Sequence, residues 1–115
     1  MKLHFSATGL DMTVELEKYA AKKVSRLERI MPKQMRSHAD CIIHFKQVHR
    51  GDNKINTCTL TLNFADQQLT ATEATVHMYA ALDIACVHIE HQLADYAAAH
   101  HKRRIRRILR RPFSR

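Results

Sequence analysis

Residues 57–64 read Thr-Cys-Thr-Leu-Thr-Leu-Asn-Phe, and this stretch decides the fold. Apolar residues alternate strictly with polar ones, which is the period of a β-strand with one buried and one solvated face. Threonine on the polar side also favours the extended conformation because its Cβ is branched. The sequence therefore predicts a sheet that is covered on one face and open to water on the other.

Three further segments of the chain show a similar alternation. Together with the first they give four expected strands, at residues 2–7, 41–46, 57–64 and 68–72. Gly9 ends the first strand, a polar loop at residues 50–53 follows the second, and a tight turn at Ala65-Asp66 joins the last two.

Two segments have the longer period of an amphipathic helix. The first begins at Thr13, whose side chain can cap the helix, and ends at Pro32, while the second begins after about Thr75. The apolar stripe of the first helix comprises Leu16, Tyr19, Ala20, Val24, Leu27 and Ile30. That of the second comprises Met78, Leu82, Ala85, Ile89, Leu93 and Tyr96.

These elements predict an α+β fold with the order β-α-β-β-β-α. Both helices are expected to pack side by side on the apolar face of the four-stranded sheet, an arrangement similar to that of double-stranded RNA-binding domains. A chain of 115 residues that is 45% hydrophobic suits a single domain. We expect this domain to span residues 1–101 and a basic C-terminal arm to span residues 102–115.

The net charge of +8 can be assigned entirely to this arm. Residues 1–101 carry as many acids as bases, whereas residues 102–115 contain no acid. The bases of the arm are Lys102, Arg103, Arg104, Arg106, Arg107, Arg110, Arg111 and Arg115. Because a polyanion that binds such an arm releases counterions, the charge favours nucleic acid as the partner, followed by an anionic membrane.

The apolar residues of the arm do not continue the stripe of the second helix. Ile105, Ile108 and Leu109 fall more than ~90° around the helix from it. We therefore expect a bend or a mobile arm that becomes ordered against RNA phosphates, with Pro112 preventing a long helical ending.

Several classes of protein are not favoured by the sequence. The first residues lack the apolar core of a secretory signal, and no segment has the apolar length of a membrane span, so we expect a cytoplasmic protein. Cys41, Cys58 and Cys86 are odd in number and lack paired spacing, which indicates reduced core residues.

No catalytic or metal-binding pattern is present in the sequence. His88 and His91, or His100 and His101, lack a carboxylate or cysteine that would converge on them, so we expect no metal and no cofactor. The chain has no Gly-rich phosphate loop and no recognisable Ser/His/Asp set. We therefore expect that the protein is not an enzyme.

Basic residues line one face of the first helix. Lys18, Lys22, Arg26 and Arg29 follow i, i+4, i+8, i+11 spacing, opposite the apolar stripe. A strip of this kind is by itself typical of a solvated helix face. Lys23 differs because it falls within the apolar stripe, where a lysine either extends its stem to the helix edge or has a function.

Three segments of the helices carry a family resemblance. They are Thr-Val-Glu-Leu at residues 13–16, Lys-Val-Ser-Arg-Leu-Glu at residues 23–28, and His-Met-Tyr-Ala-Ala-Leu-Asp at residues 77–83, the last followed by Gln92-Leu93. With them the chain resembles the ribosome hibernation-promoting factor family, also described as ribosome-associated inhibitors or ribosomal subunit interface proteins. The resemblance covers about residues 1–98.

The resemblance implies a nonenzymatic bacterial protein that binds the small ribosomal subunit. Its expected site is the rRNA of the channel that holds messenger RNA and the tRNAs of the A and P sites, so that binding blocks translation in stationary phase or stress. Family members bind rRNA through basic residues on the exposed faces of both helices. Lys23 and Arg26 match such positions, and Lys22 and Arg29 are neighbours that could add to the same surface.

The second helix departs from the family pattern. His88 and His91 stand where the family usually carries Lys or Arg, Asp95 and Ala97 replace further basic positions, and Gln92 is retained. A phosphate-rich surface would favour the protonated form of the two imidazoles. We expect the arm to compensate with Lys102, Arg103, Arg104, Arg106 and Arg107.

The family's long form carries a C-terminal dimerisation domain that this sequence lacks. The resemblance therefore implies a short-form member that is monomeric when free. Joining of ribosomes into dimers would then require a further ribosome-dimerising factor.

Two other classes of protein remain as the main alternatives, and a third is weaker. One is a general double-stranded RNA-binding module that recognises the shape and phosphates of a duplex. The other is a peripheral membrane protein anchored by Ile105, Ile108, Leu109 and the surrounding arginines. A small RNA-processing hydrolase is the weakest alternative.

Overall fold

The structure is a computed structural model that describes residues 1–65 and 67–110, with side chains up to residue 99 except that of Gln34. Its elements are β1 (Lys2–Thr8), α1 (Val14–Ile30), α2 (Lys33–Arg36), β2 (Asp40–Arg50), β3 (Asn53–Phe64), β4 (Gln67–Thr75) and α3 (Met78–Arg110). The predicted α+β fold and the order β-α-β-β-β-α are confirmed. The short helix α2 is an addition that the sequence pattern did not indicate.

The four strands form one sheet in the order β1-β2-β3-β4. β1 is parallel to β2, and the other neighbouring strands are antiparallel. The register aligns Phe5, Ile43, Leu60 and Ala71 across all four strands. Because side chains alternate between the faces of a strand, this register collects the apolar residues on one face of the sheet.

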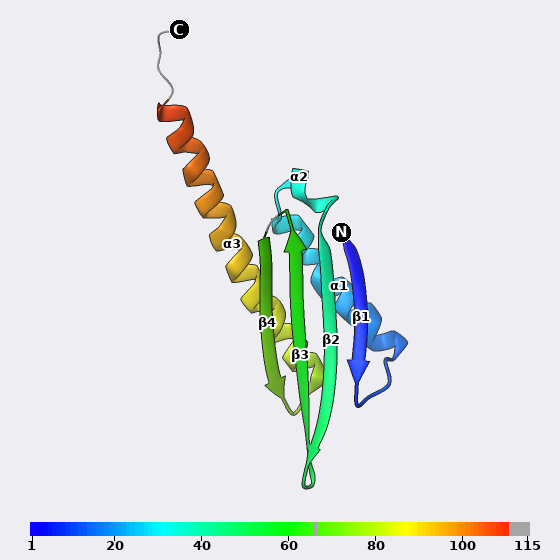
Figure 1. Ribbon diagram of the computed structural model, residues 1–115. Coiled ribbons are helices and arrows are strands. Elements are labelled where there is room, and N and C mark those ends of the chain that lie inside the picture. Colours follow the sequence, from blue (N-terminus) through cyan, green and yellow to red (C-terminus); the bar gives the residue numbers. More distant parts are fainter. Residues whose placement is uncertain (66, 111–115) are drawn as a thin grey trace.

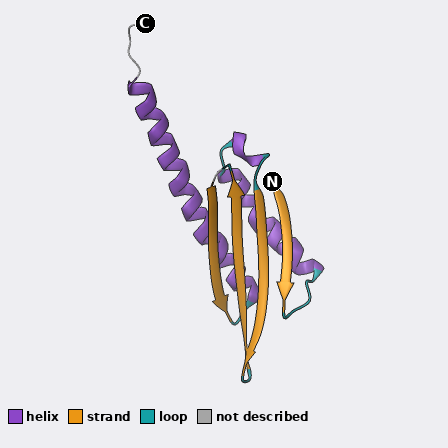
Figure 2. Cartoon of the chain, in the orientation of Figure 1, coloured by secondary structure: helices purple, strands orange, loops and turns teal. Residues whose placement is uncertain are grey.

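Helices α1 and α3 lie side by side on the apolar face and leave the other face open (Figure 1, Figure 2). The core between the two layers consists mainly of fully buried residues of α1, β2, β3 and α3. They include Val24 and Leu27 of α1, Phe45, Leu60, Leu62 and Phe64 of the sheet, and Leu82, Ile89 and Leu93 of α3. Burial of each such side chain contributes about 1.5–3 kcal/mol to folding before conformational entropy is subtracted.

Helix α1 begins where predicted, but one residue of its predicted buried stripe, at the end of the helix, is not buried. The hydroxyl of Thr13 accepts a hydrogen bond from the backbone N–H of Leu16 at 3.1 Å, which caps the first turn. Ile30 was predicted to complete the buried stripe, and this is wrong, since it is 37% exposed. The helix ends at Ile30, and the following residue, Met31, enters the core with 2% exposure.

Helix α3 does not show the expected bend at the start of the arm. It continues without interruption to Arg110, across the expected boundary at residues 101/102, and projects past the end of the sheet (Figure 1). Residues 97–110 contain neither Gly nor Pro and are rich in Ala and Arg, which have high helix propensity. The expected helix-ending role of Pro112 lies outside the described residues.

The three cysteines are reduced and buried, as predicted. Burial is the main reason that the pKa of each thiol is raised to about 12, and the neighbouring thiols add to the effect for Cys41 and Cys58. For Cys86 the second cause is the carboxylate of Glu90. The thiols are therefore protonated packing groups, as expected of structural cysteines.

Candidate nucleic-acid interface

The largest set of exposed cations on the body lies on α1. Lys18, Lys22, Arg26 and Arg29 are all exposed, and we call them the α1 basic strip. The strip faces away from the sheet because Leu16, Ala20, Val24 and Leu27 occupy the opposite side of the helix and are buried. Among the described residues, no member of the strip forms an ion pair. These cations are therefore available to an anionic partner.

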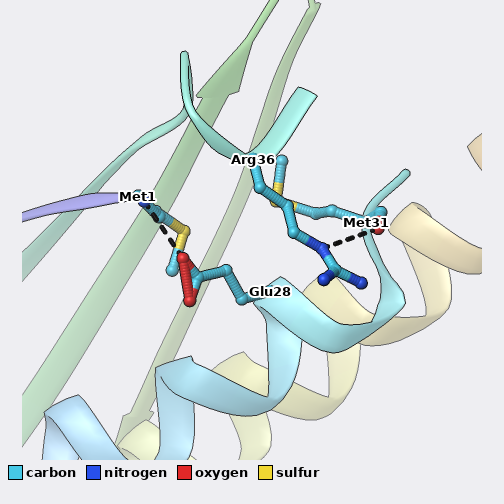
Figure 3. Close-up of polar contacts among 4 residues, drawn as sticks. All are labelled: Met1, Glu28, Met31 and Arg36. Carbon is cyan, nitrogen blue, oxygen red and sulfur yellow. Dashed lines mark hydrogen bonds and ion pairs between the residues drawn. The ribbon is translucent and has the colours of Figure 1, made fainter. Parts of the chain in front are cut away.

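The acids of α1 are placed where they do not neutralise the strip. Glu15 and Glu17 lie in the first turn, where they interact favourably with the helix dipole. Glu28 accepts a hydrogen bond at 3.0 Å from the N-terminal ammonium of Met1, which ties the start of β1 to α1 (Figure 3). The positive charge of the helix surface consequently increases toward its C-terminal end.

Helix α2 extends this charge beyond the end of α1. The guanidinium of Arg36 donates from Nε to the carbonyl oxygen of Met31 and from Nη2 to that of Arg29, both at 3.1 Å, and Figure 3 shows the first of these bonds. A cation at this place satisfies free carbonyls and complements the helix dipole. Lys33 is exposed beside it. Sequence reasoning missed both residues because it assigned no helix after Pro32.

Lys23 does not belong to the basic strip but to the seam between α1 and α3. Its Nζ lies 3.4 Å from Oδ1 of Asp83 and 5.5 Å from the ring centroid of Tyr19, and its side chain is only 27% exposed. The hydroxyl of Tyr19 donates to the same carboxylate oxygen at 2.7 Å. The ring of Tyr79 meets that of Tyr19 edge-on at 4.7 Å. We call Tyr19, Lys23, Tyr79 and Asp83 the seam cluster.

The seam cluster changes the electrostatics of both helices. The hydrogen bond to Asp83 is the main cause of a raised pKa at Tyr19, with burial second. Lys23 has Asp83 as a counterion, so it adds less free positive charge than a member of the α1 basic strip. Its position within the apolar stripe therefore has a structural cause, because it joins the two helices.

On α3 two of the three predicted RNA-binding residues contact the neighbouring strand β4. Nε2 of His88 lies 2.9 Å from Oε1 of Glu73, and Nε2 of Gln92 donates to the carbonyl oxygen of Thr70 at 3.1 Å. Both contacts join α3 to β4. His91 is exposed, and the side chain of His88 is also exposed. The three residues follow i, i+3, i+4 spacing and therefore share one side of α3, where His88 and Gln92 also contact β4.

The part of α3 that covers the sheet carries acidic charge. Residues 78–99 contain Asp83, Glu90 and Asp95 but no Lys or Arg. The predicted cations Lys102, Arg103, Arg104, Arg106 and Arg107 lie on the helical continuation of α3, at the end toward which α1 also points (Figure 1). The backbone thus places the basic part of α3 and the basic end of α1 at one end of the molecule. In the described part of the chain no helix is long and apolar enough to cross a membrane.

The described residues contain no group of three or more metal-ligating side chains. The shortest contact between a possible nucleophile and a base joins Ser6 Oγ and His44 Nδ1 at 2.6 Å, on the open face of the sheet. The other ring nitrogen of His44 faces the hydroxyl of Thr8 at 3.3 Å instead of a carboxylate. This pair lacks the orienting acid of a catalytic triad. The geometry favours a binding surface.

Fold and surface together define a small α+β domain with a cationic helix face. A family model described as Sigma 54 modulation protein / S30EA ribosomal protein matches residues 3–111. The chain belongs to this family, which confirms the resemblance inferred from its helices. A comparison with curated proteins found no match.

Solved structures share the fold. The N-terminal domain of Protein Y from Thermus thermophilus superposes with a TM-score of 0.68 at 18% identity, covering 84% of this chain and 99% of that one. A ribosomal subunit interface protein from Coxiella burnetii gives a TM-score of 0.69 at 21% identity, covering 85% and 99%. At these identities the likeness concerns the fold.

Proposed function

We propose that this protein is a nonenzymatic ribosome hibernation factor of the cytoplasm. It binds the rRNA of the small ribosomal subunit in the channel for messenger RNA and for the A- and P-site tRNAs, and it blocks translation by obstruction in stationary phase or stress. The observation that carries the proposal is the α1 basic strip, whose cations are exposed and unpaired within the described part of the chain. Family membership and the names of the structural neighbours support the ribosome as the target.

In this proposal two surfaces of the protein bind the rRNA. The α1 basic strip and Lys33 contact phosphates from the body, and the basic end of α3 reaches further along the RNA. From Ala97 to Arg110 the helix advances roughly 20 Å, at about 1.5 Å per residue. Of the predicted residues on α3, His88 and His91 are both exposed and could contact RNA, and His88 and Gln92 also hold α3 against β4.

The test is co-sedimentation of the full chain with purified small subunits, with duplex RNA and with anionic vesicles, alongside inhibition of a translating extract. We expect preference for the subunits and inhibition at matching concentrations. Replacement of Lys22, Arg26 and Arg29 by Gln should weaken subunit binding by about 1 kcal/mol for each phosphate that is no longer bound. Lys2→Gln, on the open face of the sheet, is the matched control and should bind normally.

The same experiment distinguishes the proposed function from the two main alternatives. Equal binding to any duplex RNA would indicate a general double-stranded RNA-binding module. Binding to vesicles but not to subunits would indicate a peripheral membrane protein. A folded strip variant that binds subunits like the wild type would refute the role of α1.

A further inference from the structure

The hairpin between β2 and β3 extends beyond the rest of the sheet. β1 stops pairing at Thr8, opposite Lys46, and β4 ends its pairing at Thr75, opposite Asn56. The register of β2 and β3 nevertheless continues to Arg50 and Asn53. Beyond the Gln47–Asn56 pair, residues 48–55 therefore form a two-stranded ribbon, which projects at the end of the molecule opposite to the end of α3 (Figure 1). We call this segment, together with Lys46 at its base, the β2–β3 ribbon.

Buried hydrogen bonds hold the base of this ribbon in place. Asn56 is 5% exposed, and its side chain accepts a hydrogen bond from Nε2 of Gln47 at 2.7 Å. Its Nδ2 donates to the carbonyl oxygen of Val76 at 2.9 Å, just before α3 begins. Both polar groups of the amide are therefore satisfied, and the ribbon has a defined direction relative to the helices.

The tip of the ribbon is exposed and basic. Lys46, Arg50 and Lys54 are exposed, and within the described residues none of them forms an ion pair. Asp52 is the single acid of the segment. By the alternation of a strand, Lys46 and Arg50 lie on one face of the ribbon, while Lys54 lies on the other, directly opposite His49 of β2. Cations on both faces suit a ribbon with phosphates on either side.

Lysine at an exposed strand edge also has a purely protective use, since it discourages pairing with other chains. That explanation requires charge at the edges but no rigid base. The buried amide of Asn56 and the unpaired cations on both faces fit a preorganised contact better, because preorganisation lowers the cost of binding.

We propose that the β2–β3 ribbon is a second RNA-binding element, which contacts the phosphate backbone at the opposite end of the molecule from the basic end of α3. The inference rests on the proposed function in that the RNA is taken to be rRNA. The protein then contacts its RNA at both ends and along α1, which fixes its orientation in the site. Phosphate contacts of this kind set position and register without reading bases.

The test compares full-length variants in a salt series with purified small subunits and, separately, with an A-form RNA duplex. The ribbon variant carries Lys46→Gln, Arg50→Gln and Lys54→Gln, and its matched control carries Lys46→Arg, Arg50→Lys and Lys54→Arg. The ribbon variant should bind subunits about ten-fold or more weakly, with a salt dependence reduced by the equivalent of about two to three neutralised phosphates. The control should retain most of the affinity. Asp52→Asn should strengthen binding by about two- to five-fold.

Each outcome separates this inference from the proposed function. Unchanged affinity and salt dependence of the ribbon variant, together with much weaker binding by the α1 variant, would overturn the ribbon contact and leave the proposed function standing. Failure of the wild type to bind subunits, with ribbon-dependent binding to the duplex, would remove the ribosomal role and retain the RNA contact. Equal unfolding midpoints in urea establish that the exposed substitutions leave the fold intact.

Discussion

At Gly9 the backbone of the neighbouring strand β2 leaves no room for a side chain. Its φ is +79°, and a Cβ added there would lie 2.2 Å from the carbonyl oxygen of Gln47 on β2. The left-handed conformation alone costs other residues about 1–2 kcal/mol, and a contact this short with strand backbone requires β2 to move. Gly9→Ala should therefore lower the free energy of unfolding by about 2 kcal/mol or more, measured by urea denaturation.

Gly51 provides the matched control for this prediction. Its φ is +61°, but an added Cβ would meet no atom within 4 Å. Gly51→Ala should cost only the conformational part, about 1 kcal/mol. Equal destabilisation at the two positions would show that the approach of Gly9 to Gln47 is not the cause.

The three thiols give the folded protein a pH dependence in the alkaline range. Their pKa values are raised from 9.0 to about 12, so the folded chain keeps protons that the unfolded chain releases. This contribution to stability is complete below pH 9 and is lost as the pH rises toward 12. The raised pKa of Tyr19 acts in the same direction. The urea midpoint should therefore fall as the pH rises from about 9 toward 12, and less steeply in Cys86→Ala.

Alkylation provides a second measurement of the same thiols. Because the thiolate is the reactive form, the folded protein should resist iodoacetamide at about pH 8 and react once it is unfolded in urea. Rapid labelling of the folded chain at that pH would contradict the burial of these residues.

At the scale of elements, the parts that could be predicted from sequence are those set by local periodicity. The strict alternation of residues 57–64 determined the faces of the sheet, and Thr13 marked the start of α1 through a contact three residues away. The extension of β2 and β3 beyond their neighbours could not be predicted, because it depends on where β1 and β4 stop pairing. The direction of His88 and Gln92 likewise depends on the position of α3 beside β4.

Lys23 shows how the distinction between a binding and a structural residue depends on packing. Tyr19 is its i−4 neighbour on α1, but only the approach of α3 reveals Asp83 as its ion-pair partner. The continuation of α3 to Arg110 was missed for a related reason. By helical spacing, Ile105, Ile108 and Leu109 do not continue the buried stripe, which disfavours packing against the core but does not prevent a helix from extending past the sheet.

The seam cluster leads to a prediction about Asp83→Asn. Loss of the carboxylate should move the pKa of Tyr19 back toward its ordinary value of 10.0, which ultraviolet titration measures against a Tyr19→Phe control. Stability should decrease by about 1 kcal/mol, since an amide oxygen still accepts the hydrogen bond. RNA binding should stay equal or become a few-fold tighter, because Lys23 loses its counterion. Weaker binding by a variant of unchanged stability would instead make Asp83 part of the RNA contact.

At the scale of the whole molecule, the positive charge is concentrated at the margins. The α1 basic strip, α2 and the end of α3 converge toward one end, the β2–β3 ribbon carries further cations at the other, and the body of α3 between them is acidic. Such an arrangement gives an extended contact with a polyanion and a defined orientation. A uniformly basic surface of the same net charge would bind with less preference for one orientation.

Removal of residues 102–115 tests how much of the binding depends on the end of α3. The deleted segment carries the whole excess charge of +8, so the shortened chain is formally neutral. The core should remain intact, because among the residues with described side chains the last fully buried one is Leu93, well before residue 102. We expect weaker subunit binding and a logarithmic salt dependence that is flatter by about 0.7–0.9 for each phosphate that the shortened chain no longer neutralises.

A full-length variant with the basic residues of 102–111 replaced by Gln keeps the helix but not its charge. If charge is the cause, this variant should behave like the truncated chain, whereas a contribution from helix length or apolar contacts would leave it closer to the wild type. Retention of the original affinity and salt dependence by both variants would assign binding to the α1 basic strip and the β2–β3 ribbon alone.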